Sequence, residues 1–500
     1  MKRLAWFDRL VLATILALIA AISSILIQGK QVPNRGEKFS WQGRKIGVRD
    51  NYFTLSFNRP IDRSDVETSL VINPPLRGKI SWSGDRLTYT LTELPIYGKK
   101  YQVKLPIAQG EYFIGEFYSH DRAFAYIGVN QEERGRLIVC NIIQGPNNLT
   151  ELKKTILTPG DLVVTDFQIY PRGDRILFSA FDRSDLGRDT PKQQLYTITT
   201  GLNHDENSQN LPSGRIERFL DAKTYQNLRF NLSDNGKTLI VQRINHGNPG
   251  DASLWVISDD GQSRPLGIQG DNFLLSPDGK KAVVSQTGGV AVIPLDVQGG
   301  KPQFLPTYEK ILAFSRDGRQ KLMVKSEPDN QRSLFLLNDR GESRLLLRTA
   351  NPIISCEFEP RQEKTLYCLK SDLVMGSDGK VKEEPFLGII ELETGKMIPL
   401  LALPNYRDVQ MSMSPDGVAL LFDQLVTIPF GVGNDLVTGE GSSIADGRLW
   451  LLPLPDQFSP NSIPNIFPPA LNAGFKARGL PENYPAVAML SASRVKLSVN

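Results

Sequence analysis

The sequence predicts an all-β protein: an N-terminal transmembrane helix, a small β-sandwich and then a β-propeller, with seven blades favoured and six possible. Two observations lead to this prediction. A turn tetrapeptide of the Ser-Pro-Asp-Gly kind recurs through residues 111–455, and residues 10–27 form an uncharged apolar run. A repeat of roughly forty residues is the size of one four-stranded blade. Propellers serve many functions, so the repeat predicts an architecture and not a reaction.

The N-terminal run determines the expected location. Residues 1–9 are basic and are predicted to stay in the cytoplasm, and residues 10–27 would span about 27 Å as a helix, close to the thickness of a bilayer core. The apolar part of a secretory signal peptide has roughly 7–15 residues. The longer run favours an uncleaved signal-anchor, with a cleaved signal as the alternative. Either interpretation exports the rest of the chain, to the periplasm or the cell surface.

Composition excludes some functions. The chain is 40% hydrophobic and 22% charged, which is typical of a globular protein. The net charge of +4 is small for 500 residues, so we expect no nucleic-acid partner. The sequence has only three histidines, His120, His204 and His246, which disfavours imidazole catalysis and a multi-histidine metal site.

A compact β-domain is predicted at 46–108, after a polar linker at 28–45. Short runs that alternate apolar and polar residues, such as 53–57 and 87–91, are separated by Gly and Pro turns, and this spacing favours a sandwich.

The stretch 53–105 resembles the bacterial Ig-like domain of S-layer and envelope proteins, the SbsA type. The matching segments are Leu-Ser-Phe-Asn-Arg-Pro-Ile-Asp at 55–62, Trp-Ser-Gly-Asp-Arg-Leu at 82–87, and the spacing of Leu94, Gly98, Tyr101 and Val103. In that family the domain is mostly a spacer or adhesive module. The resemblance therefore implies a non-catalytic stalk.

The turn tetrapeptides begin at residues 119, 170, 233, 276, 315, 359 and 414. The copies at 276 and 414 are the plainest; the copy at 119 lacks Gly, and at 359 the residue in the Gly position is Gln362. Apolar residues precede most copies, β-rich runs follow them, and a second Gly-containing turn closes several units. Each unit thus predicts a four-stranded meander.

The repeated Asp and Gly residues have two interpretations. They could be metal ligands, but an Asp that precedes Gly accepts backbone hydrogen bonds and holds a hairpin. We favour structural turns, at Asp278, Gly279, Asp317, Gly318, Asp416 and Gly417.

This unit resembles the TolB-type propeller repeat, a WD40-like repeat that also occurs in propeller domains of some serine peptidases. The resemblance covers 111–455 and is strongest in the units that start at 233, 276, 315 and 414. TolB-type propellers commonly have six blades. The Gly-x-Ser-x-Gly motif of a nucleophile elbow does not occur in the sequence, so we expect no catalytic residues and a protein that is not an enzyme.

Other candidates are weaker. Cys356 and Cys368 flank one turn symmetrically and could form a cross-strand disulfide in an oxidising compartment, with two buried thiols as the alternative. Asp182, Asp185 and Asp189 are weak Ca²⁺ candidates on what is more simply a solvated loop. We expect no cofactor.

The end of the chain, 456–500, is Pro-rich and is predicted to be an extended tail, although 487–499 alternates and could add a strand to the small β-domain or to a propeller edge. The resulting hypothesis is a membrane-anchored extracytoplasmic binding or scaffolding protein whose propeller loops bind an envelope protein or a cell-wall polymer. The alternatives are a propeller-type hydrolase or lyase with its site at the channel mouth, and an assembly or sensor factor for a membrane complex. The insertions at 182–193, 201–213 and 428–446 break the repeat, so binding is expected there.

Overall fold

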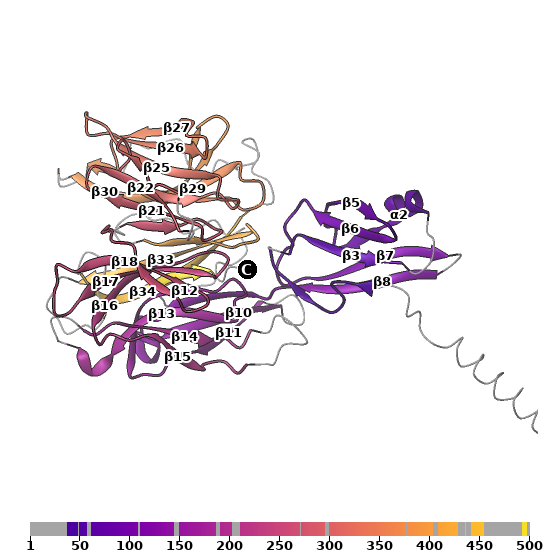
Figure 1. Ribbon diagram of the computed structural model, residues 1–500, viewed down its shortest axis with the longest axis horizontal. Coiled ribbons are helices and arrows are strands. Elements are labelled where there is room, and N and C mark those ends of the chain that lie inside the picture. The colour runs from indigo at the N-terminus through magenta and orange to yellow at the C-terminus, as the bar shows by residue number, and fades with distance from the viewer. Residues whose placement is uncertain are drawn as a thin grey trace, which may run out of the picture. The chain divides into compact units, whose positions relative to one another are not determined.

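The computed structural model describes residues 38–48, 50–57, 62–108, 111–144, 150–186, 191–202, 211–270, 272–295, 300–375, 379, 381–403, 409–428, 436, 442–454 and 493–497. They form two compact units (Figure 1). Of the described residues, the first contains 38–44, 50–93 and 100–117, and the second contains 45–49, 94–99 and the chain from 118 onward. Within these ranges no helix is both long and apolar enough to cross a membrane. The predicted n-region and anchor, 1–9 and 10–27, lie outside them.

The first unit consists of two sheets and one short helix. One sheet has the order β1 (Lys38–Phe39), β3 (Tyr52–Ser56), β6 (Arg86–Leu91), β5 (Gly78–Ser83), and the other contains β8 (Glu111–Ser119), β7 (Lys100–Ala108) and β4 (Val71–Asn73). Alternate residues of a strand point to opposite faces, and one face of each sheet is buried. The shared core is aromatic and includes Trp41, Phe53, Tyr101 and Phe117.

Two features of this unit differ from the prediction for 46–108. A helix, α2 (Arg63–Ser69), interrupts the strands, and its cap residue Asp62 accepts a hydrogen bond of 2.9 Å from the Ser64 amide. Val66 is the one buried residue of this helix, so the sequence has no apolar periodicity that would predict a helix here. In addition, β8 pairs with β7, and the first unit therefore extends to Phe117, beyond the predicted boundaries at residues 108 and 111.

In its described residues, the second unit has seven sheets that follow one another along the chain. Each is an antiparallel meander of four strands, except the last, for which three are described. The second sheet contains β12 (Leu162–Ile169), β13 (Arg175–Asp182), β14 (Gln194–Thr199) and β15 (Ile216–Leu220), and the third contains β16 (Tyr225–Leu232), β17 (Thr238–Asn245), β18 (Ala252–Ser258) and β19 (Ser263–Pro265). The fourth contains β20 (Phe273–Leu275), β21 (Lys281–Gln286), β22 (Gly289–Pro294) and β23 (Gln303–Leu305), and the fifth contains β24 (Lys310–Phe314), β25 (Gln320–Ser326), β26 (Arg332–Asn338) and β27 (Ser343–Thr349). The sixth contains β28 (Ile353–Phe358), β29 (Thr365–Met375), β30 (Val381–Glu391) and β31 (Met397–Ala402), and the seventh contains β32 (Met411–Met413), β33 (Ala419–Ile428) and β34 (Ser443–Pro453).

The first sheet combines strands from distant parts of the chain. It contains β9 (Arg122–Ile127), β10 (Leu137–Gln144), β11 (Thr150–Ile156) and the last strand, β35 (Ser493–Leu497), which pairs antiparallel with β9. The expectation that the region 487–499 adds a strand is thus met by 493–497, in the first sheet of the propeller. The turn copy at 119 is not a blade turn, because β8 of the first unit precedes it.

Apolar clusters fill every interface between successive sheets, and one of them closes the ring. Phe124 and Tyr126 of the first sheet pack with Leu421 and Leu449 of the seventh. The other six interfaces have clusters of their own. One edge strand of each sheet contacts an edge strand of the next sheet. Examples are β28 with β32, β32 with β35 and β35 with β12. They are therefore the innermost strands of a closed propeller with seven blades, the favoured count.

The tetrapeptides form the turns between the first and second strands of the blades. Gly279 has a φ of 71° and its amide bonds the Ser276 carbonyl at 2.8 Å. Asp278 accepts from the Ser276 hydroxyl at 2.6 Å and from the Lys280 amide at 3.0 Å. Gly318 and Gly417, with φ of 72° and 67°, occupy the same left-handed position. This geometry is available to Gly at little cost, which explains the signature.

The turn at 359 differs from its prediction. The residue with positive φ is Glu363, at 51°, and not Gln362. The Glu363 amide donates to the Glu359 carbonyl at 3.1 Å, a bond that spans four residues, whereas the Gly279 bond spans three. One additional residue in this turn therefore moves the left-handed position past Gln362.

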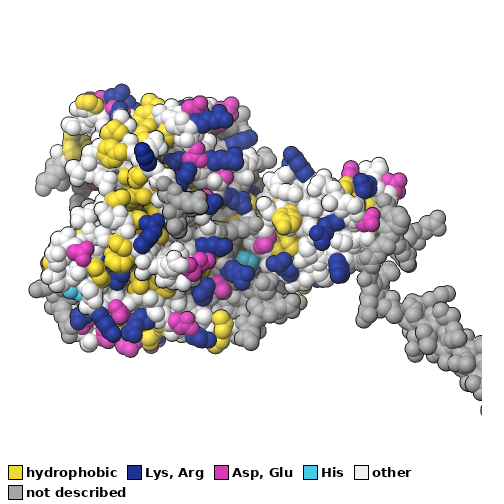
Figure 2. Space-filling view, viewed as in Figure 1, with side chains coloured by type: hydrophobic (Ala, Val, Ile, Leu, Met, Phe, Trp, Pro, Cys, Tyr) yellow, Lys and Arg dark blue, Asp and Glu magenta, His cyan; other side chains and the backbone are white. Residues whose placement is uncertain are grey.

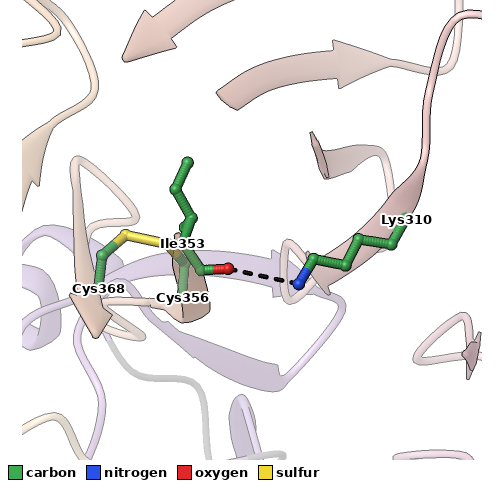
Figure 3. Close-up of a disulfide and its surroundings, with 4 residues drawn as sticks. All are labelled: Lys310, Ile353, Cys356 and Cys368. Atoms are coloured by element: carbon green, nitrogen blue, oxygen red, sulfur yellow. Dashed lines mark hydrogen bonds between the residues drawn. A yellow bond between two sulfur atoms is a disulfide. The ribbon is translucent and has the colours of Figure 1, made fainter. Parts of the chain in front are cut away.

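The fifth and sixth blades are joined near a disulfide (Figure 3). Cys356 and Cys368 are directly paired in β28 and β29 and are bonded, with 2.06 Å between the sulfur atoms. Both are 1% exposed. Lys310 of β24 donates to the Ile353 carbonyl at 3.3 Å, and burial lowers the pKa of its ammonium group. The third cysteine, Cys140, is buried, and this burial raises the pKa of its thiol to about 11.

Candidate binding surfaces at the two ends of the propeller

The meander topology gives the propeller two different ends. In each blade the connections between the first and second strands and between the third and fourth strands fall at one end, which we call the turn end. The connections between the second and third strands, and those that lead to the next blade, fall at the opposite end, the loop end. The tetrapeptides therefore mark the turn end.

The predicted insertions are divided between these ends. Segment 182–193 joins β13 to β14 and segment 428–446 joins β33 to β34, so both lie at the loop end. Segment 201–213 joins β14 to β15 and lies at the turn end. An apolar cluster unites Leu436 and Ile444 of segment 428–446 with Phe181, which directly precedes segment 182–193, and with Val129 and Val163 of the first and second blades.

Two arginines reinforce this contact at the loop end. Arg134 follows the short helix η1 (Gln131–Glu133) of the first blade and donates to the carbonyls of Val129, at 2.7 Å, and Ile444, at 3.0 Å. Arg183 of the second blade donates to the carbonyls of Gly160, at 2.7 Å, and Arg134, at 2.9 Å. These hydrogen bonds thus link the seventh, first and second blades to one another. Arginines that bind backbone carbonyls leave no motif, and sequence reasoning missed them.

The weak metal candidates are not assembled into a site. Asp182 caps the short helix η3 (Arg183–Asp185) by accepting from the Ser184 amide at 2.8 Å, and Asp185 is 8% exposed within it. Asp189 lies outside the described residues. Across the ranges that the structure describes, no group of three or more His, Cys, Asp or Glu residues could hold a metal ion.

Polar side chains of the innermost strands support the neighbouring strand. Gln168 of β12 accepts from the Leu232 amide at 2.5 Å, Asn231 of β16 from the Leu275 amide at 2.7 Å, and Glu357 of β28 from the Met413 amide at 2.8 Å. Each bond satisfies a backbone donor at the inner edge of the next blade. These groups have a structural role.

Asp416 is an exception among the turn carboxylates. It is 2% exposed, and its Oδ2 accepts from the backbone amide of Tyr97 at 3.1 Å. The Ser414 hydroxyl accepts from the Ala419 amide at 2.9 Å. Arg361 of the neighbouring turn donates to the Asp416 carbonyl at 2.7 Å. Asp416 therefore connects the seventh-blade turn to a segment far away in the sequence.

Tyr97 belongs to a short segment held across the turn end. Its hydroxyl accepts from the Val48 amide at 3.3 Å, and its carbonyl accepts from Arg122 of the first blade at 3.0 Å. Arg316 of the fifth-blade turn donates to the Val48 carbonyl. Segments 45–49 and 94–99 thus bridge the first, fifth and seventh blades, and we call them the strap.

The histidines show no catalytic arrangement in the described chain. The His120 ring lies 5.7 Å from the Tyr97 ring beside the strap, and the His246 Nε2 atom is 3.2 Å from the Ala222 carbonyl oxygen. His204 lies outside the described residues. On the face drawn in Figure 2, Lys and Arg side chains are interspersed with Asp and Glu, without a large field of one sign.

These sheets, registers and interfaces define the protein as a seven-bladed β-propeller that follows a small two-sheet domain. No protein-family model and no curated protein matches the chain. Similar solved structures include TolB from Acinetobacter baumannii, 13% identical over 69% of this chain and 84% of that chain, with a TM-score of 0.36. Puromycin hydrolase is 13% identical over 68% of this chain and 60% of that chain, with a TM-score of 0.38. A chain of a nidogen/laminin complex is 10% identical over 57% and 93%, with a TM-score of 0.33. With scores this low, the assignment rests on the chain's own sheet order and clusters.

Proposed function

We propose that this chain is a membrane-anchored extracytoplasmic protein that binds or scaffolds a partner, an envelope protein or a cell-wall polymer, on the loop end of its propeller. The observation that carries the proposal is the convergence of 182–193 and 428–446 at that end, where Arg183 donates to the Arg134 carbonyl and Arg134 donates to the Ile444 carbonyl. Loops on a rigid scaffold are the usual place for binding residues.

The use of the polar groups favours binding over catalysis. Asp278 and Asp317 accept the hydrogen bonds of their own turns, Asp416 holds the strap, and Asp182 caps a helix. A general base must lie within hydrogen-bonding distance of the group from which it takes a proton. Each of these carboxylates serves the fold.

The disulfide supports export. A buried cross-strand bond between Cys356 and Cys368 persists in an oxidising compartment and is rare in the cytosol. It agrees with an anchor at 10–27 followed by an extracytoplasmic chain. We assign the first unit the role of a spacer, on the strength of the Ig-like resemblance of 53–105.

Partner isolation tests this proposal. Leu186 is 38% exposed at the loop end, next to η3, whereas Phe304 is 49% exposed on an outermost strand, β23. Purification from native membranes should recover the same partner with wild type and with Phe304→Asp, and at least tenfold less of it with Leu186→Asp. Equal recovery with both variants contradicts loop-end binding. Turnover of a peptide or glycan that carboxylate variants abolish would establish an enzyme instead.

A further inference from the structure

The hairpin of β29 and β30 extends beyond its sheet at the loop end. Its register runs without a break to the pair Met375 and Val381. The inner neighbour β28 pairs with β29 only as far as Lys370, and the outer neighbour β31 pairs with β30 only as far as Phe386. Among the residues that the structure describes, no further strand therefore pairs with the outer part of this two-stranded ribbon on either side.

One face of this ribbon is apolar and exposed. Leu369 belongs to the cluster between the sixth and seventh blades, so Leu373 and Met375, which follow at a period of two residues, face the seventh blade as well. Val381 lies opposite Met375 on the same face. The side chains of Leu373, Met375 and Val381 are 57%, 70% and 61% exposed.

The neighbouring hairpin presents a matching surface. Phe422 of β33 belongs to the same cluster, and Val426, four residues further along an unbroken register, therefore faces the sixth blade. Val426 is 48% exposed, although β32 pairs with β33 only as far as Phe422. We call Leu373, Met375, Val381 and Val426 the ribbon face. Exposed apolar side chains that cluster in this way mark interaction sites.

The charges beside the ribbon face restrict its partner. Glu383 lies opposite Leu373, Asp446 lies opposite Val426, and both are exposed. Arg448 is exposed on the same side but lies two pairs deeper, opposite Gln424. The outer part of the face is thus apolar and acidic, which complements a partner with aliphatic and basic side chains.

We propose that the ribbon face binds an extended segment of a partner protein in which aliphatic and basic residues take turns at every second position, so that both kinds of side chain lie on one face of the segment. Such a segment adds as a strand to an unpaired ribbon edge, with main-chain hydrogen bonds for affinity and alternate side chains for specificity. The inference rests on the proposed function, because it specifies the chemistry of a protein partner at the loop end.

A labelled synthetic nonapeptide with valine and lysine in turn at every second position and serine between them tests this inference on the purified full chain. We expect fluorescence anisotropy to show binding that weakens at least tenfold for Leu373→Asn/Met375→Asn and does not change for the matched control Phe304→Asn. The same peptide with glutamate in place of lysine, and the original peptide methylated on alternate backbone nitrogens, should bind at least tenfold more weakly. Circular dichroism checks that both variants are folded.

Several results overturn the inference. They are absence of binding to the wild type, an equal loss with Phe304→Asn, or equal binding of the methylated peptide. Photo-cross-linking from position 375 in the same preparation identifies other occupants: adducts with residues 404–408 of the same chain, or with a second copy, also overturn it. The peptide assay needs no native partner, so the two proposals can fail separately. If only the partner isolation with the Leu186 variant fails, the proposed function is refuted. If only the peptide assay fails, the proposed partner chemistry alone is refuted.

Discussion

The backbone amide of Tyr97 donates a hydrogen bond of 3.1 Å to the Asp416 carboxylate, across 319 residues of sequence. Asp416 occupies the same turn position as Asp278, whose carboxylate accepts from the Ser276 hydroxyl and the Lys280 amide of its own turn. One copy of the repeated turn has therefore become the anchor of the strap.

Loss of this anchor should free Tyr97 selectively. Asp416→Ala leaves a buried amide without its acceptor, which costs about 1–3 kcal/mol of unfolding free energy. Hydrogen exchange at the Tyr97 amide should accelerate in Asp416→Ala and not in the control Asp278→Ala. Unchanged protection at Tyr97 in Asp416→Ala would show that the contact does not hold the strap.

Asparagine should replace Asp278 at little cost. The third-blade turn already uses Asn235, which accepts from the Ser233 hydroxyl at 2.7 Å and from the Lys237 amide at 2.9 Å. We expect Asp278→Asn to change the free energy of unfolding by less than about 0.5 kcal/mol, and Asp278→Ala to lower it by about 1 kcal/mol. Urea unfolding measures both. Equal losses would contradict the hydrogen-bonding role of the side chain.

Glu363 should make stability depend on pH. Burial raises the pKa of its carboxyl, and the hydrogen bond from the Arg316 amide opposes this only in part. The folded protein therefore binds the proton more tightly than the unfolded chain. The resulting stabilisation is complete below the unfolded pKa, about 4.3, and is lost as the pH rises through the folded pKa.

Glu363→Gln keeps an acceptor oxygen for the Arg316 amide and removes the titration. Its melting temperature should match that of the wild type near pH 4 and exceed it at pH 7. The exposed Glu383→Gln is the control and should show no such trend. A Glu363→Gln variant that is less stable than the wild type at pH 7 would show that the charged form is favoured in the fold.

Thiol titration tests the disulfide. The chain has three cysteines, and the bond between Cys356 and Cys368 leaves one thiol per denatured, unreduced chain and three after reduction. Cys356→Ala/Cys368→Ala should lower the free energy of unfolding by about 2–4 kcal/mol. Three thiols before reduction of protein isolated from its native compartment would remove the support for export.

Local chemistry explains which parts of the fold the sequence predicted. The turns at 276 and 315 were found because Asp278 and Gly279, or Asp317 and Gly318, are required by the hairpin itself. The spacing between these turns in the sequence then predicted the number of blades. The disulfide partners were visible because Cys356 and Cys368 are symmetric about one turn.

Long-range pairing explains what was missed. The alternation in 487–499 predicted an additional strand but not its place in the first blade, since the partner strand β9 lies at the other end of the propeller sequence. Asp416 looks like any other turn residue until Tyr97 is beside it. The ribbon face also requires the fold, because only the register shows that Met375 and Val426 belong to facing surfaces.

Closure by β35 gives a direct test of the ring. A chain that ends at residue 492 loses the innermost strand of the first blade and exposes the inner edge of β9. We expect a lower melting temperature and faster exchange at Ala125 and Ile127. A chain that ends at residue 497 should behave like the wild type. Identical stability of the two truncated proteins would contradict the closure.

Site-specific photo-cross-linking in native membranes tests whether the partner binds at the loop end of the propeller. A photoreactive residue is placed in turn at Leu186, at the loop end, at Lys280, at the turn end, and at Phe304, on the outer strand of the fourth blade. We expect one recurring adduct from position 186 and none from positions 280 and 304. An adduct of equal yield from position 280, or none from position 186, would contradict binding at the loop end.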